Sequence, residues 1–291
     1  MRPALWTGMF CKFNIPLEDT IRRLSEVGFR AAELCEPYLD RLSHRTNSLE
    51  SARKLRALCN EREFSLSQAH GPTLAFASSD RAAREEACAR VESLFPLLEI
   101  LGVTTVVLHP DQPEVPQAKH LNDAPPWTFA WNNCISFNGE SFRRLSNVSG
   151  KFGIQIAVEN LIDGKDFERQ VFGARPIDLE MLLTEAPELG MNLDTAHGHT
   201  QHLDLPAIIQ HCGPRLYGLH VSDNHGEPYD KHLIPGKGTI DWPRVISALK
   251  VAGYQGDFHL ELPHERDDNI ETTTRAAQEA YLTTVNLLES L

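Results

Sequence analysis

VTTVVLH, at residues 103–109, is a run of mostly β-branched residues that ends in a histidine. A continuous apolar run of this kind is typical of a strand that is buried on both faces. Working outward, a helical pattern precedes the run from Asp80 to about Leu101, and another follows at about 139–151 before the strand GIQIAVE at 153–159. This alternation predicts parallel strands joined by helices.

The same alternation extends from one end of the chain to the other. We expect strands at 4–9, 29–35, 64–70, 103–109, 153–159, 190–194, 215–220 and 257–262, with helices at 17–27, 48–60, 80–101, 139–151, from Pro176, 204–212, 241–252 and 268–290. Eight such units favour an α/β fold of the closed (β/α)8 barrel type, with an open doubly wound sheet as the rival. No G-x-G-x-x-G follows a strand and no linker of low complexity divides the chain, so we expect residues 1–291 to form a single barrel domain.

The alternation of strands and helices is interrupted at about 110–137, in a stretch that is rich in Pro, Asn and Trp. Unstructured connections of this length are usually functional, so we expect a long active-site loop here. Its aromatic residues include Trp131. Aromatic faces suit the C–H surfaces of sugars, but they also stack on bases or pack within a loop.

Composition limits the partners of the chain. There are 28 Lys and Arg against 40 Asp and Glu, a net charge of −12, so a basic stripe for nucleic-acid phosphates is not evident and a small-molecule substrate is favoured. The six cysteines include no C-x-x-C pair and are interpreted as free thiols of a reducing compartment. No secretory signal and no membrane span is visible, so we expect a cytoplasmic location without a membrane partner. A homo-oligomer is left open.

The residues that close the predicted strands are the main functional signal. In a barrel the active site lies at the carboxyl ends of the strands. A single histidine there is more often a packed core residue, but six consecutive ends carrying metal-binding side chains are hard to explain by packing, because buried charge is costly unless it is paired or metal-bound. The six are His70, His109, Glu159, Asp194, His220 and Glu261.

Two short segments extend this set. His197 follows the sixth strand in the segment DTAH, and Asp230 and His232 lie in the loop after the seventh. Taken alone, such pairs are common by chance. Mixed nitrogen and oxygen donors without cysteine favour a divalent metal such as Zn, Mn, Co or Mg. We expect one to three ions, with zinc or manganese preferred.

These segments together resemble a known superfamily. The segments are HGP (70–72), LHP (108–110), VEN (158–160), LDTAH (193–197), LHVSDN (219–224), DKHLIPGKGTIDW (230–242) and LEL (260–262). They are similar to the xylose isomerase-like TIM-barrel superfamily, which holds sugar phosphate isomerases and epimerases together with the endonuclease IV family of apurinic-site nucleases. The resemblance runs from about residue 5 to residue 285.

The epimerase branch implies one divalent metal held by Glu159, Asp194, His220 and Glu261. It also implies proton transfer next to a carbonyl, with Glu159 and Glu261 as acid and base and His197 against the substrate. An arginine expected about six residues after the metal-binding histidine is missing here, where the chain reads Asn224-His225-Gly226. Further candidates for the substrate pocket are Trp6, Glu33, Trp131 and Lys237.

The endonuclease IV branch implies three zinc ions and cleavage of abasic DNA. All nine ligands of that pattern are present: His70, His109, Glu159, Asp194, His197, His220, Asp230, His232 and Glu261. Other features favour the sugar branch, namely Gly71-Pro72 after His70, the segment FGARP (172–176) and the lack of a G-A-H-V-S opening. A third alternative, a degenerate barrel that only binds or scaffolds, is disfavoured by the intact ligand set. We therefore expect a metal-dependent isomerase or epimerase of a sugar, sugar phosphate or keto-sugar.

Overall fold

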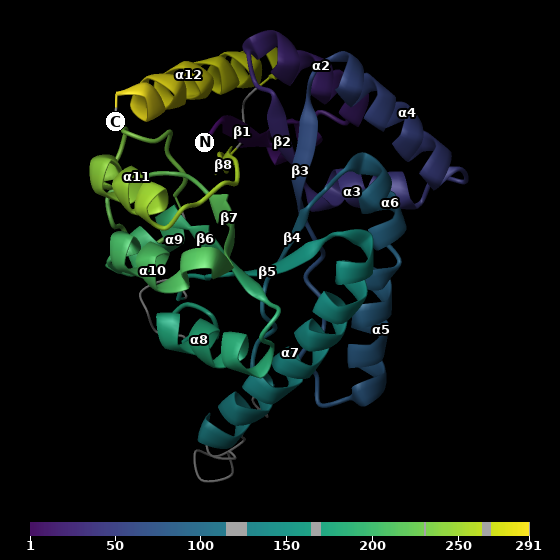
Figure 1. Ribbon diagram of the computed structural model, residues 1–291, viewed down its shortest axis with the longest axis vertical. Helices are drawn as coiled ribbons and strands as arrows, with labels where there is room; N and C mark the ends of the chain where they lie inside the picture. The colour runs from purple at the N-terminus through teal and green to yellow at the C-terminus, as the bar shows by residue number, and fades with distance from the viewer. Residues whose placement is uncertain (115–126, 164–169, 230, 264–268, 291) are drawn as a thin grey trace.

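Eight parallel strands form a nearly closed barrel inside a ring of helices (Figure 1). The computed structural model describes residues 1–114, 127–163, 170–229, 231–263 and 269–290. The strands are β1 (Pro3–Trp6), β2 (Ala31–Leu34), β3 (Ser65–His70), β4 (Thr105–Leu108), β5 (Gln155–Glu159), β6 (Gly190–Asp194), β7 (Leu216–His220) and β8 (Phe258–Leu260).

Strand pairing follows chain order from β1 to β7, and β8 pairs with β1. The last junction, between β7 and β8, is closed by a single bridge between Val221 and Leu260. There the Val221 amide donates to the His259 carbonyl at 2.7 Å, and the Glu261 amide donates to the Val221 carbonyl at 3.1 Å. The predicted barrel is therefore confirmed, and the rival open sheet is wrong.

The helices pack around the outer face of the strands (Figure 1). They are α1 (Gly8–Cys11), α2 (Leu17–Val27), α3 (Glu36–Ser43), α4 (Ser48–Glu61), α5 (Arg81–Glu92), α6 (Phe95–Leu101), α7 (Trp127–Ser149), α8 (Pro176–Glu185), α9 (Thr195–Thr200), α10 (Leu205–Cys212), α11 (Trp242–Val251) and α12 (Ile270–Glu289). Aspartates cap several of them: Asp80, Asp204 and Asp241 each accept a hydrogen bond from an amide of the first turn. Within the described residues, no helix is both long and apolar enough to cross a membrane.

The interior of the barrel is polar below its mouth, which is the end where the strands finish. Gln68 on β3 donates to Glu33 on β2 at 3.2 Å and to Asn192 on β6 at 3.4 Å. Because β3 and β6 are not neighbours in the sheet, the second contact crosses the interior. Gly218 on β7 leaves room for the contact between Gln68 and Asn192, because a Cβ at this position would lie 2.5 Å from the side-chain oxygens of both residues. Apolar side chains occupy the space between the strands and the helices.

The prediction of a loop over 110–137 is wrong for residues 127–137, which are helical. Helix α7 begins at Trp127, well before residue 139, and residues 115–126 lie outside the described part. A buried stripe of Ala130, Cys134, Asn138 and Phe142 recurs every four residues, which is helical spacing. The polar Asn138 and the small Ala130 in this stripe weaken its apolar periodicity in the sequence.

Two other boundaries differ from the expectation. The helix expected over 80–101 is two helices, α5 and α6, because Pro96 has no amide hydrogen with which to continue the first. The first strand ends at Trp6 instead of Met9, because Gly8–Cys11 forms the short helix α1.

Candidate metal centre

The strand ends gather the predicted ligands at one end of the barrel. His70, Glu159, Asp194 and His220 are the last residues of β3, β5, β6 and β7, and His109 and Glu261 directly follow β4 and β8. All six meet in groups whose ligand atoms lie within 4.8 Å of one another. This convergence follows from the fold, because parallel strands of one barrel all end on the same face.

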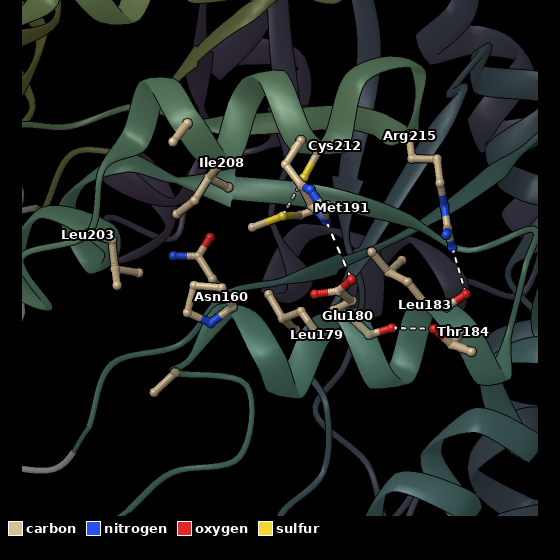
Figure 2. Close-up of a pocket in the computed structure, with 14 residues that line it drawn as sticks. Asn160, Leu179, Glu180, Leu183, Thr184, Met191, Leu203, Ile208, Cys212 and Arg215 are labelled. Carbon is tan, nitrogen blue, oxygen red and sulfur yellow. Dashed lines mark hydrogen bonds and ion pairs between the residues drawn. The ribbon is translucent and has the colours of Figure 1, made fainter.

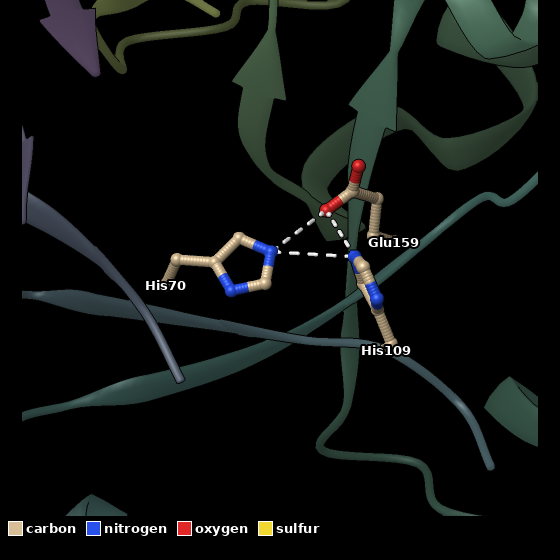
Figure 3. A group of neighbouring side chains, drawn as sticks. All are labelled: His70, His109 and Glu159. Carbon is tan, nitrogen blue, oxygen red and sulfur yellow. Dashed lines mark hydrogen bonds and ion pairs between the residues drawn. The ribbon is translucent and has the colours of Figure 1, made fainter. Parts of the chain in front are cut away.

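The first group consists of His70, His109 and Glu159, which point toward one another in Figure 3. The two Nε2 atoms are 3.3 Å apart. Glu159 Oε2 lies 3.3 Å from His109 Nε2 and 3.6 Å from His70 Nε2. The other ring nitrogen of His70, Nδ1, lies 2.9 Å from the Gly71 carbonyl, which fixes the ring with Nε2 facing the group.

The second group consists of Glu159, Asp194, His220 and Glu261, and it is the most deeply buried. His220 Nδ1 lies 3.1 Å from Glu159 Oε2 and 3.2 Å from Glu261 Oε2. These separations are those of neighbouring ligands around one ion with bonds of about 2.1 Å.

Within the described part of the chain, each member of this second group carries at least one buried polar atom without a hydrogen bond, and His220 carries two, Nδ1 and Nε2. Glu159 Oε2, Asp194 Oδ2, His220 Nδ1 and Glu261 Oε2 are buried and have no hydrogen-bond partner among the described residues. Burying such atoms without a partner is costly, so the set is explained by a cation to which all four bind. The residues therefore fit a divalent metal.

The third group consists of Asp194, His197 and His232. Asp194 Oδ1 accepts from the His197 amide at 2.7 Å, and the two histidine rings meet edge to face with centroids 5.7 Å apart. His232 Nδ1 lies 3.0 Å from both the Ser222 hydroxyl and the Glu261 carbonyl. Asp230, the ninth predicted ligand, lies outside the described residues. Glu159 and Asp194 each belong to two groups, so the three groups form one continuous cluster.

Charges within this cluster shift the pKa values of its members. Burial works against the ionisation of Glu159, but His220 and His109 hold its pKa well below the ordinary value. Burial likewise opposes the charging of His70, yet Glu159 raises the pKa of that ring to about 9. For Glu261, burial dominates and raises the pKa to about 7. Without a metal, protonated histidines supply the positive charge that the carboxylates require.

Two buried residues that support the ligands were not predicted in that role. Glu33, expected only as a pocket residue, places Oε2 at 2.8 Å from His220 Nε2. Asn160 follows β5 and holds the Asp194 backbone on both sides, accepting from its amide at 2.7 Å and donating to its carbonyl at 3.0 Å. Neither lies at a distinctive spacing in the sequence, although the segment VEN (158–160) includes Asn160.

The candidate substrate residues fall into two classes. Trp6 ends β1 beside Glu33, and its indole N–H is buried without a partner among the described residues. Trp131 lies on α7 and donates to Asp178 of α8 at 3.3 Å, and Lys237 forms an exposed ion pair with Glu279 of α12 at 3.1 Å. Within the described residues, these hydrogen bonds and ion pairs direct Trp131 and Lys237 to α8 and α12 instead of the ligand groups.

A separate apolar pocket of about 390 Å³ lies between α8 and α10, outside the barrel (Figure 2). Its polar groups are bonded within the protein: Arg215 donates to the carbonyls of Leu183 and Leu189, and His211 lies 3.7 Å from Glu180. Asn160 forms part of its wall and also holds the Asp194 backbone, so this residue joins the pocket to the metal groups.

Comparison with known proteins agrees with this geometry. The D-psicose 3-epimerase of Enterocloster bolteae is 23% identical over 251 residues, which cover 82% of this chain and 74% of that protein. This chain spans about half or less of the length of several curated relatives. The match covers 48% of one of these relatives and 25% of each of three others.

Solved structures resemble the whole chain. A D-psicose 3-epimerase in the presence of D-fructose has a TM-score of 0.78 at 16% identity, covering 99% of each chain. An IolI protein with a bound zinc atom has a TM-score of 0.76 at 18% identity, covering 100% of this chain and 99% of that one. At these identities the likeness shows the fold. The family model for the xylose isomerase-like TIM barrel matches residues 21–284. The chain therefore belongs to the xylose isomerase-like TIM-barrel family.

Proposed function

We propose that this protein is a divalent-metal-dependent isomerase or epimerase of a sugar, a sugar phosphate or a keto-sugar. The observation that carries the proposal is the second ligand group, in which two glutamates, an aspartate and a histidine present four unsatisfied buried atoms to one point. Sugar epimerases among the relatives and the solved structures support the choice of reaction.

The ligands would be Glu159, Asp194, His220 and Glu261. A divalent cation bound there would polarise a carbonyl and its neighbouring hydroxyl and so acidify the C–H bond between them. The protein then needs a base to take that proton and an acid to return one. We assign these roles to Glu159 and Glu261, which lie at the ends of the different strands β5 and β8 and reach the same ligand group. His197 would contact substrate oxygens, and Trp6 would form part of the pocket wall.

Zinc or manganese suits this donor set best, because the ligands are imidazole nitrogens and carboxylate oxygens. The groups around His70 and around His197 give the site capacity for one to three ions. A solved structural neighbour with a bound zinc atom supports zinc.

The proposal is tested by proton exchange. We would incubate the protein, with added zinc or manganese, with ketoses, ketose phosphates and keto-inositols in deuterated water and follow the carbon next to the carbonyl by NMR. We expect deuterium to enter that carbon. Glu159→Gln and Glu261→Gln should each lose at least about 10³-fold in exchange rate. Glu92→Gln, on the outer helix α5, is the matched control and should exchange at the native rate. Near-native exchange rates in both the Glu159 and the Glu261 variants would contradict the assignment of these two residues as acid and base.

One observation favours a second candidate, a trinuclear zinc phosphodiesterase acting on abasic DNA. The three ligand groups share Glu159 and Asp194, as a cluster of three ions requires. Its test is a duplex with one abasic site, offered over a range of salt concentrations because phosphate-driven binding weakens as salt rises. Incision of that duplex, without deuterium exchange into any sugar, would contradict the isomerase proposal and favour the phosphodiesterase. A barrel that only binds or scaffolds need retain no metal after purification, so metal analysis of protein purified without added metal tests that alternative.

A further inference from the structure

Two cysteines meet at the mouth of the barrel. Cys11 is the last residue of α1, and Cys35 directly follows β2 and precedes α3. Their sulfur atoms lie 2.8 Å apart, although the residues are 24 positions apart in the chain. Three other cysteines place their sulfurs differently: Cys88 and Cys134 point at carbonyl oxygens, and Cys212 meets the Met191 thioether at 3.3 Å.

The backbone around the two thiols is held by Thr7. Its hydroxyl accepts from the Cys35 amide at 3.0 Å, and its own amide donates to the Glu33 carbonyl at 3.0 Å. The Cys11 sulfur lies 3.9 Å from its carbonyl oxygen. Thr7, which lies between β1 and α1, therefore holds the Cys35 backbone and contacts the Cys11 sulfur.

The two thiols differ in access to solvent. Cys35 is completely buried, whereas Cys11 is partly exposed. Burial works against the ionisation of Cys35, but hydrogen bonds from Cys11 and Thr7 hold its pKa below the ordinary value. The exposed thiol is thus the one that an oxidant reaches, and the buried thiol has the thiolate character needed to attack a neighbouring sulfur.

We propose that Cys11 and Cys35 form a reversible disulfide by exchange with a small-molecule disulfide such as oxidised glutathione. The Cys11 thiol gives up its proton to solvent as its sulfur attacks one glutathione sulfur, and the first glutathione leaves as a thiolate that takes up a proton. The Cys35 thiolate then attacks the Cys11 sulfur, the mixed disulfide breaks, and the second glutathione leaves. The two cysteines lose two electrons and two protons, and both are recovered in two reduced glutathiones.

The geometry needs little change for this bond to form. The sulfurs must approach from 2.8 Å to about 2.05 Å. The new bond would tie α1 to the end of β2, next to Trp6 and Glu33, and would constrain the unfolded chain by closing a loop between positions 11 and 35. We expect the midpoint of thermal unfolding to rise by about 5 °C or more.

The experiment equilibrates the intact protein with mixtures of reduced and oxidised glutathione, blocks free thiols by alkylation and maps disulfides by mass spectrometry. We expect a Cys11–Cys35 linkage that a reductant reverses, together with the rise in the unfolding midpoint. Cys11→Ser should lose both effects. Cys35→Ser should stop at a glutathione adduct on Cys11. Cys212→Ser is the matched control, since Cys212 is also partly exposed, and it should behave as the native chain.

Two results would overturn the proposal. One is alkylation of both Cys11 and Cys35 as free thiols in the most oxidising mixture. The other is a stable glutathione adduct on Cys11 of the native protein without a bond to Cys35. Neither readout uses catalytic activity, so the outcome is independent of the proposed reaction.

Discussion

Glu33 contacts a ligand of the candidate metal centre, His220, but does not belong to the ligand groups. The side chain is completely buried, its Oε2 lies 2.8 Å from His220 Nε2, and it also accepts from Gln68. A carboxylate behind a metal-binding histidine fixes the orientation of the ring and makes the ligating nitrogen more basic. Glu33 therefore acts as a positioning residue for His220.

The substitution Glu33→Gln tests this role, because it keeps the size of the side chain and removes its charge. We expect zinc affinity to fall about 10- to 100-fold. Competition with a chromophoric chelator measures the affinity, and Glu92→Gln on α5 serves as the control. Unchanged affinity in Glu33→Gln would mean that the contact with His220 is only packing.

The strand-end ligands could be predicted from the sequence and the supporting role of Glu33 could not. His109 and Glu159 each close a β-branched, largely apolar run, so the fold class alone puts them at the mouth of the barrel. Glu33 lies inside the short strand β2, where a charged residue has no periodic signal of its own. Its partner is on β7, and only the closed barrel brings the two together.

At the scale of an element, the loop between β7 and α11 depends on one buried carboxylate. Asp223 accepts four hydrogen bonds: Oδ1 from the amides of Asn224 and Ile240, and Oδ2 from the Gly236 amide and the Trp242 indole. Gly238 is required beside it, because a Cβ there would lie 2.3 Å from Oδ1. This carboxylate therefore holds both ends of the loop that carries His232.

We expect Asp223→Asn to destabilise the fold by about 3 kcal/mol, because an amide group cannot accept all four bonds and the donors are buried. The same variant should lose the ion held by His197 and His232 before the ion held by His220. Urea unfolding and metal analysis after dialysis measure the two effects. Asp241→Asn is the matched control in the same loop, since Asp241 caps α11 through a single bond near the surface that an Asn oxygen accepts equally well, and its loss should be well under about 1 kcal/mol. Equal losses in both variants would contradict this role of Asp223.

Helix α7 shows why some elements escape prediction. Its buried face includes Asn138, whose side chain accepts from the Asp111 amide at 2.9 Å and donates to the Asp111 carbonyl at 3.0 Å. A polar residue that is buried through its bonds to a distant loop looks exposed in the sequence. The periodic helices α2 and α12, with apolar stripes and polar outer faces, agree closely with the expected ranges of 17–27 and 268–290.

At the scale of the whole molecule, barrel closure concentrates negative charge at the mouth. Glu159, Asp194 and Glu261 converge within one ligand group, and Glu33 lies just behind it. The metal-free protein tolerates this because His70 and His220 hold protons and because the pKa of Glu261 is raised to about 7, since like charges held close in a buried site repel strongly. Protons and metal ions should therefore compete for the centre, and metal uptake should release protons.

The last prediction follows from that competition. In the metal-free folded protein the pKa of His70 is raised to about 9, above its ordinary value near 6.5, mainly because Glu159 outweighs the opposing effect of burial. A group with a raised folded-state pKa contributes stability that is fully present below the unfolded-state pKa and is lost as pH rises through the folded-state value. The metal-free protein should thus lose on the order of 3 kcal/mol of unfolding free energy between about pH 6.5 and pH 9.

The metal-loaded protein should behave in the opposite way over the same range. A ligating His70 is already neutral, so raising the pH removes no proton from it, and tighter metal binding stabilises the folded state further. Urea unfolding at several pH values, with a chelator or with zinc, measures both curves. In the chelated series His70→Asn should flatten the decline, whereas His44→Asn, on the outer surface, should leave it unchanged. A metal-free protein whose stability stays level or rises from pH 6.5 to 9 would show that Glu159 does not hold a proton on His70.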